Sequence, residues 1–416
     1  MATKRSFNNM LLEYLHYDLL KEEHNKRNYF MQKVERDNGW KDGPLPVAFE
    51  AAQESSFKMG GLTDENDIAE AKFVKGYAPQ QAEIWGTMQW NERDLAEHSG
   101  TGGGDSVSEQ SFLKNLPKRL TGFMDAMKEI VSTALLAGSH LGFVTVQGTA
   151  GGVIEVDRPE RFVIGQKLVA VDGNSTVTCY VIAIDINANQ LTVSATRGGA
   201  AMNATAVDLG AKLYIDGAEI SANRFVDIVD QLLPASAGGS ATIFGVSKIA
   251  QPYTQAIAID GSGISSVNVL ESIFDAWGEV IRKGRGTTDK TLLMSYKHMG
   301  NVMKQLEKGS GAYRHVDTKV SAYGYTEVKV SGPKGVVTLA SVQEMRDDVM
   351  VFIDWSALKF HTNGDFHIHK DPEGKAYYTK RVSGANGGYL YLTDICLRGQ
   401  LVVHSPAKMA VIHSIP

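Results

Sequence analysis

Residues 111–138 read SFLKNLPKRLTGFMDAMKEIVSTALLAG, and this stretch decides the fold. Its apolar side chains recur every three or four positions, which is the spacing of one face of an α-helix. Pro117 fits an early turn, where its missing N–H does no harm, and Gly138 is placed to end the helix in a left-handed cap. Such a helix would be on the order of 35 Å long. The residues expected to form its core are Leu116, Leu120, Phe123, Met127, Ile130 and Leu135.

After this helix, residues 150–217 are dense in short β-type runs. The runs KLVAV, TVTCYVIAI, QLTVS and KLYIDG are separated by turn sequences such as VDGN and DINANQ, and runs of this kind predict short strands joined by tight turns. Four or five strands at this spacing predict a small barrel or sandwich inserted in the chain.

Helical periodicity returns after the insertion, in ISSVNVLESIFDAWGEVIRKG and YKHMGNVMKQLEKG. Strand-like runs then dominate to the end of the sequence, among them DVMVFIDWSALKF and YLYLTDICLRGQLVVHSP. The chain is therefore predicted to be α+β with an inserted β unit.

On the N-terminal side of the helix, residues 71–95 read as two extended pieces around a proline-containing turn, a long hairpin. The first residues have helical spacing but too little apolar surface to fold alone. Both segments must therefore lie against the body of the chain or against a neighbouring subunit. The candidate anchors for contact between subunits are Phe73, Trp85, Trp90, Tyr14 and Leu11. The alternative is that the hairpin aromatics pack within the chain.

Composition narrows the class of protein. The net charge of -5 and a pI near 6.1 argue against electrostatic binding of nucleic acid, which needs a basic surface. Two cysteines, Cys179 and Cys396, are too few for a disulfide framework and are expected to be buried. No secretory signal is apparent, and no run reaches the roughly 18 apolar residues that span a membrane. These features predict a soluble, cytosolic chain.

The one pattern that suggests a metal is FHTNGDFHIHK, where His361, His367 and His369 could surround a zinc ion, with Asp354 or Asp365 completing the set. The other interpretation is an exposed strand that happens to carry histidines. Neither HExxH, CxxC, GxSxG nor a phosphate-binding lysine motif accompanies it. We therefore expect that the chain is not an enzyme and that it binds no cofactor and no metal. The alternative from another functional class is a metal-dependent hydrolase that uses these three histidines.

The order of these elements resembles the major capsid protein of tailed double-stranded DNA bacteriophages, with the Hong Kong 97-type fold. The resemblance spans nearly the whole chain and rests on overall pattern. Besides the helix, the stretches that carry it are WNERDLAEHS (90–99), DRPERFVIGQKLVAVDG (157–173), TLLMSYKHMGNVMKQLEKG (291–309), VQEMRDDVMVFIDWSALKF (342–360) and YLYLTDICLRGQLVVHSP (389–406).

The resemblance implies a division of the chain. Residues 1–65 would be an N-terminal arm, 66–111 an extended loop (the E-loop), and 112–149 the peripheral domain with its spine helix. An inserted β-domain would follow at 150–217, the axial domain at 218–345, and a return to the peripheral domain at 346–416. Removing residues 1–40 is then expected to leave a folded body that no longer forms closed particles.

The resemblance also implies a function. The chain would assemble with itself as hexamers and pentamers into an icosahedral or prolate shell around phage DNA, without sequence-specific binding. It would be part of the virion capsid, assembled in the bacterial host cytoplasm, with portal, scaffold and decoration proteins as partners and no membrane. The alternatives are an encapsulin-like compartment or another phage structural assembly protein such as a tail tube, and a β-module that binds carbohydrate.

Overall fold

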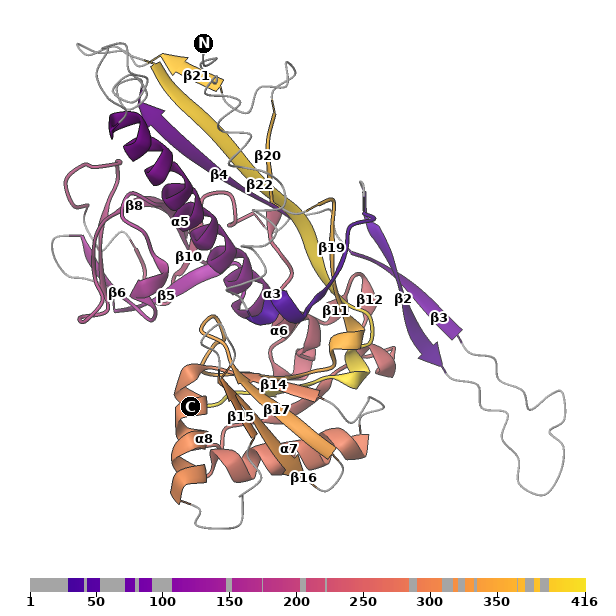
Figure 1. Ribbon diagram of the computed structural model, residues 1–416. Helices are drawn as coiled ribbons and strands as arrows, with labels where there is room; N and C mark the ends of the chain where they lie inside the picture. The colour runs from indigo at the N-terminus through magenta and orange to yellow at the C-terminus, as the bar shows by residue number, and fades with distance from the viewer. Residues whose placement is uncertain are drawn as a thin grey trace, which may run out of the picture.

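The computed structural model combines a long helix on a six-stranded sheet, a closed β-barrel, and a seven-stranded sheet with two helices (Figure 1). The residues that it describes are 29–40, 43–52, 72–78, 82–91, 107–146, 152–173, 175–202, 207–220, 223–283, 290–308, 317–320, 326–332, 335–364, 366–370, 378–381 and 389–416.

The long helix α5 runs over Val107–Ala137, 31 residues, or about 46 Å at the usual rise per residue. It ends at Gly138, whose φ of 97° lies in the left-handed region that glycine adopts without strain. The helix begins earlier than the sequence suggested, so Pro117 lies inside it and not in an early turn. A proline there removes one backbone hydrogen bond of the helix.

The six-stranded sheet is built on β22 (Tyr389–Val403). On one side, β4 (Ala82–Asn91) pairs with it antiparallel from Gly399 opposite Ala82 to Leu390 opposite Asn91. The other strands, β19 (Leu358–Thr362), β20 (His367–Ile368) and β21 (Tyr378–Arg381), pair along its other side. A short β1 (Glu35–Asp37) adds to β19 in parallel.

The strands in 71–95 do not form a hairpin with each other. Instead β3 (Lys72–Ala78) pairs with β2 (Leu45–Ala52), while β4 joins the six-stranded sheet. The reason is burial, because Ala82 and Met88 of β4 face the core that α5 covers. The real hairpin, β2–β3, stands out from the body on the side away from the barrel (Figure 1).

The first described residues belong to the core. In α3 (Tyr29–Lys33), Tyr29, Phe30 and Met31 are buried in the same cluster as α5 and the six-stranded sheet. The rings of Tyr29 and Phe30 lie 6.3 and 6.0 Å from the ring of Trp355. A cut at residue 40 would therefore remove part of this core together with the arm, which weakens the expectation that a folded body remains.

The barrel closes in the strand order β10-β5-β6-β9-β8-β7 and has its own core. Its strands are β5 (His140–Val146), β6 (Val153–Val156), β7 (Lys167–Asp172), β8 (Ser175–Asp185), β9 (Gln190–Ser194) and β10 (Lys212–Ile215). The first strand lies before residue 150, because β5 follows α5 directly. The 3₁₀ turn η2 (Pro159–Arg161) holds the barrel to the body, since Arg161 donates to the Glu344 carbonyl at 3.0 Å.

The seven-stranded sheet has the order β13-β23-β18-β14-β17-β16-β15. Its strands are β13 (Ile257–Asp260), β14 (Lys290–Met294), β15 (Asp317–Val320), β16 (Thr326–Gly332), β17 (Gly335–Ser341), β18 (Met350–Ile353) and β23 (Ala410–His413). The helices α7 (Val269–Lys283) and α8 (Tyr296–Lys308) share one apolar cluster with one face of it. Residues 346–416 are therefore divided, since β18 and β23 lie in this sheet and β19 to β22 in the other.

Short elements connect these parts. They are α6 (Ile228–Leu232), β11 (Thr242–Ile243), β12 (Val246–Ser247), and the 3₁₀ turns η5 (Ala235–Ala237), η6 (Pro252–Thr254), η7 (Trp355–Ala357) and η8 (Pro406–Lys408). The carboxylate of Asp227 caps α6 by accepting from Asp230 N, and buried Lys248 donates to the carbonyls of Asp230 and Leu233 at its other end. None of the described helices is long and apolar enough to cross a membrane.

Candidate functional site along the free edge of β4

Strand β4 lies at an edge of its sheet. Among the described strands it pairs only with β22, so the backbone groups on its other side face no further strand of that part of the chain. An edge strand of this kind presents a row of N–H and C=O groups to which another extended segment can pair. The edge is therefore a candidate surface for β-strand addition.

The strand is held very close to α5 by one glycine. A Cβ at Gly86 would lie 2.5 Å from Phe123 Cζ and 2.7 Å from Met127 Sδ. Only a residue without a side chain allows this approach. The face of β4 therefore packs directly on α5 at this point, and the hollows beside its free edge form a groove along the strand.

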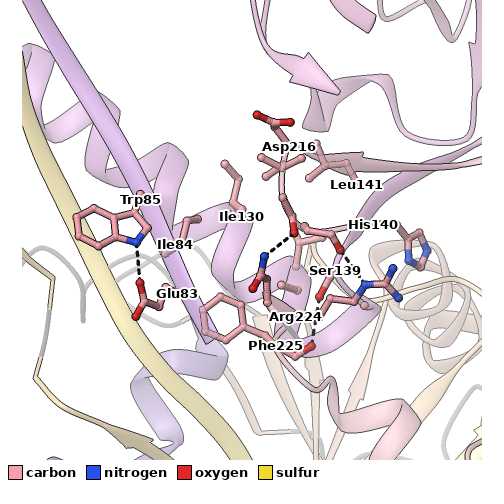
Figure 2. A pocket seen from close by; sticks show the side chains of 17 residues that line it. Glu83, Ile84, Trp85, Ile130, Ser139, His140, Leu141, Asp216, Arg224 and Phe225 are labelled. Atoms are coloured by element: carbon pink, nitrogen blue, oxygen red, sulfur yellow. Dashed lines mark hydrogen bonds between the residues drawn. The ribbon is translucent and has the colours of Figure 1, made fainter. Parts of the chain in front are cut away.

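Two hollows follow one another along β4. The first, about 440 Å³, lies between Glu83–Trp85, the end of α5 and the loop after β10 that reaches Phe225 (Figure 2). The second, about 450 Å³, is lined by Thr87, Met88, Gln89, Phe123 and Arg197. Successive hollows along a free edge can hold alternate side chains of an added strand.

Several polar groups of the first hollow have hydrogen-bond partners within it (Figure 2). Trp85 Nε1 donates to Glu83 Oε2 at 2.8 Å, and Ser139 Oγ donates to the Phe225 carbonyl at 3.2 Å. Arg224 Nε donates to the Ala218 carbonyl at 2.7 Å and its guanidinium lies 4.5 Å from the ring centre of Tyr214. This arrangement presents apolar surface and backbone more than reactive groups, which suits binding of a peptide segment.

His140 lies where this hollow meets the base of the barrel. Burial is the main reason that its pKa is lowered to about 3, and the nearby cations Lys212, Arg346, Arg161 and Arg224 lower it further. The imidazole is therefore neutral at pH 7. Its ring centre lies 4.5 Å from that of Phe143, so it acts as a packing residue at the junction of α5 and β5.

His140, at the junction of α5 and β5, should make the stability of the fold sensitive to acid. Its pKa is lower folded than unfolded, so the unfolded chain binds more protons between about pH 3 and 6.5, and stability falls as the pH falls through that range. Lowering the pH from 7 to 5 is expected to cost up to about 2 kcal/mol through this one group. The measurement is urea unfolding at both pH values for the wild type and His140→Gln. The variant should lose less stability, and an equal loss in both proteins would contradict the assignment.

The hairpin β2–β3 has two different faces. Val47, Phe49 and Ala78 are buried in a cluster with Ile243, Val246 and Val402. On the other face, Phe73 is 66% exposed and Tyr77 57% exposed. Two aromatic side chains four residues apart therefore stand on one face of an extended strand, in contact with solvent.

The three histidines singled out in the sequence are separated in the structure. His361 contacts Asp37 and His404, and the ring of His369 lies 5.3 Å from that of Trp85. His367 Nε2 lies 3.1 Å from Cys396 Sγ, where burial raises the pKa of the thiol to about 11. In the part of the chain that the structure describes, no three His, Cys, Asp or Glu residues are placed to share one metal ion. The proposed three-histidine centre is therefore wrong.

The solved structures to which the chain is similar include two capsids and a virus-like particle. No family model matches the sequence, and no curated protein matches it. Over 100% of its length the chain is similar to a structure described as the cyanophage A-1(L) capsid asymmetric unit, covering 96% of that chain at 13% identity and a TM-score of 0.48. It is also similar to the capsid of a native GTA particle, at 12% identity and a TM-score of 0.45, covering 93% of this chain and 90% of that one.

A third similar structure is a virus-like particle from Pyrococcus furiosus, at 7% identity and a TM-score of 0.36, covering 97% of this chain and 99% of that one. None of these TM-scores reaches 0.5.

The predicted anchor residues lie in different places. Phe73 is on the exposed face of β3, and Trp85 is 43% exposed on β4. The side chain of Trp90 and the whole of Tyr14 and Leu11 lie outside the described residues. Sequence reasoning missed Tyr77, although the alternation in KFVKGYA places it on the same face as Phe73.

The predicted helix core is likewise only partly described. Met127 and Leu135 are buried, while Phe123 and Ile130 are half-buried beside the hollows. The side chains of Leu116 and Leu120 lie outside the described residues. Cys179 and Cys396 are both buried and free, which confirms the expectation for them.

Proposed function

We propose that this chain is a major capsid protein of the Hong Kong 97 type, which assembles with itself into the shell of a tailed double-stranded DNA bacteriophage. The proposal assigns α5 and the six-stranded sheet to the peripheral domain and most of the seven-stranded sheet to the axial domain. The extended loop, expected at 66–111, is assigned instead to the hairpin β2–β3, whose first strand lies in the expected arm, and the barrel is the insertion. The order of elements quoted from the sequence supports this assignment.

The observation that carries the proposal is the exposed aromatic face of the hairpin. Covering Phe73 and Tyr77 would remove roughly 250 Å² of apolar surface from water, worth about 6 kcal/mol before the cost of association. One face of the hairpin is already covered by the cluster with Ile243, Val246 and Val402. The exposed aromatics on its other face are therefore best explained as a contact surface that another copy of the chain completes.

The groove along β4 is the complementary surface in this proposal. Ile84 and Met88 mark its two hollows and lie four residues apart, about 13 Å along a strand. Phe73 and Tyr77 have the same spacing on β3. Each copy would insert its hairpin into the groove of the next, a head-to-tail contact that closes rings such as hexamers and pentamers when the rotation between copies closes.

The slightly negative net charge of the chain is compatible with a shell that encloses DNA without binding it tightly. With 47 acidic and 42 basic residues, it has no overall excess of the positive charge that neutralises phosphates. Portal, scaffold and decoration proteins remain proposed partners, the virion capsid the proposed location, and the bacterial cytoplasm the proposed place of assembly. The proposal gives the chain no catalytic role.

The test is negative-stain electron microscopy of the expressed chain, with size-exclusion chromatography alongside. We expect closed particles, or rings of five and six copies that close when a scaffold is supplied. Tubes in place of closed particles would favour the tail-tube alternative, and closed particles found empty of DNA when recovered from phage-infected cells would favour a compartment. A stable monomer at high concentration would contradict the proposal.

A further inference from the structure

Three segments that are far apart in the sequence meet at a pair of histidines. His361 Nε2 lies 3.1 Å from His404 Nε2, and the two rings are inclined by 66°. On the other side of the first ring, His361 Nδ1 lies 3.1 Å from the carboxylate oxygen Oδ2 of Asp37. His361 is on β19, Asp37 on β1, and His404 directly follows β22.

The carboxylate decides where the proton of His361 resides. A contact of 3.1 Å with Asp37 favours a proton on Nδ1, although the pair is aligned as an ion contact and not as a well-directed hydrogen bond. The Nε2 of His361 then accepts a hydrogen bond from Nε2–H of His404, and a metal ion would replace that proton once His404 holds its proton on Nδ1 instead.

We propose that His361 and His404 bind one divalent metal ion of the zinc type through their Nε2 atoms, with Asp37 orienting His361. Zinc–nitrogen bonds of 2.0–2.1 Å in tetrahedral geometry separate two ligand nitrogens by about 3.3 Å. The observed separation is 3.1 Å, so a shift of a few tenths of an ångström and a small rotation of the rings admit the ion.

The surroundings match those of a metal-bound histidine. A ligating imidazole usually gives its other N–H to a carboxylate, which fixes its tautomer and orientation, and Asp37 stands in that position. His361 is buried, but His404 is half-buried and Asp37 is exposed, which leaves a path from solvent. Imidazole ligands suit zinc, copper and nickel over magnesium and calcium, and water would fill the remaining positions.

A bound ion would hold separate segments of the chain together. The ion would join β19 to the end of β22, and through Asp37 it would favour docking of β1, which follows the buried helix α3. The inference does not depend on the proposed function, because the three residues belong to one chain.

The test is calorimetric titration of the full-length chain, without a histidine tag, with zinc chloride at pH 7.5. We expect one ion bound per chain, and an increase in melting temperature with zinc. His404→Gln should lose this binding, because one of two protein ligands is gone. Asp37→Asn keeps both ligands and removes the orienting charge, so it should weaken binding by roughly 10–100-fold.

His413→Gln is the matched control. That histidine is half-buried at the end of β23 and contacts the hydroxyl of Ser414 at 3.0 Å. It should bind zinc as the wild type does. Absence of zinc binding by the wild type, or equal binding by His404→Gln and His413→Gln, overturns the proposal. If His404→Gln does not fold, Asp37→Asn decides, since unchanged affinity in that variant is equally a refutation.

Discussion

Replacing both Phe73 and Tyr77 with aspartate is expected to leave the chain folded and to abolish particle formation. Both side chains are more than half exposed on β3, so the folded monomer loses few contacts. In the proposed groove each aspartate would be a buried, unpaired charge, which costs about 3–5 kcal/mol. Size-exclusion chromatography and electron microscopy should show small species only, with the circular dichroism spectrum unchanged.

The matched control places two aspartates on the barrel, as Ile164→Asp with Ile186→Asp. These side chains are 65% and 62% exposed, so the control changes charge and apolar exposure by similar amounts. Its particles should form normally. Normal particles from the Phe73 and Tyr77 variant would show that the hairpin does not hold the copies together.

Phe30→Ala is expected to reduce the free energy of unfolding by about 3–5 kcal/mol, the usual cost of removing a fully buried phenylalanine ring. The ring has 0% exposure and packs beside Trp355. If residues 1–65 acted only as an arm on neighbouring copies, the same change would not alter the stability of the monomer. Denaturant unfolding of the unassembled chain measures the difference.

Phe73→Ala is the natural comparison, because it makes the same chemical change at an exposed position. Its effect on unfolding should stay within about 0.5 kcal/mol. Similar decreases in the free energy of unfolding for the two variants would mean that Phe30 is not a core residue. The segment around α3 would then be assigned to the N-terminal arm.

Local signals were enough to predict the secondary structure of much of the chain. Apolar spacing of three and four placed α5, and a glycine at 138 marked its end, because both effects depend on neighbours in sequence. The turn chemistry of VDGN and DINANQ likewise predicted the β7–β8 and β8–β9 connections. The start of α5 was missed because proline is tolerated inside a long helix at a cost that packing can offset.

Pairings between distant segments could not be predicted. Nothing in residues 72–91 says that β3 pairs with β2 and β4 with β22, because both choices satisfy the same alternation of side chains. The contact between His361 and His404 could not be predicted for the same reason. The two residues are 43 positions apart in the sequence, and the sheet brings them together. The free edge of β4 could not be predicted either, because it follows from β4 pairing with β22 alone among the described strands.

The barrel enters and leaves the body through adjacent strands, because β5 pairs with β10 and Phe143 lies opposite Lys212. Both ends of the module therefore join the body side by side, and η2 adds a second contact through Arg161 and the Glu344 carbonyl. A change of length within the loops between β6 and β9 would therefore leave the entry and exit strands, and the sheets outside the barrel, in place.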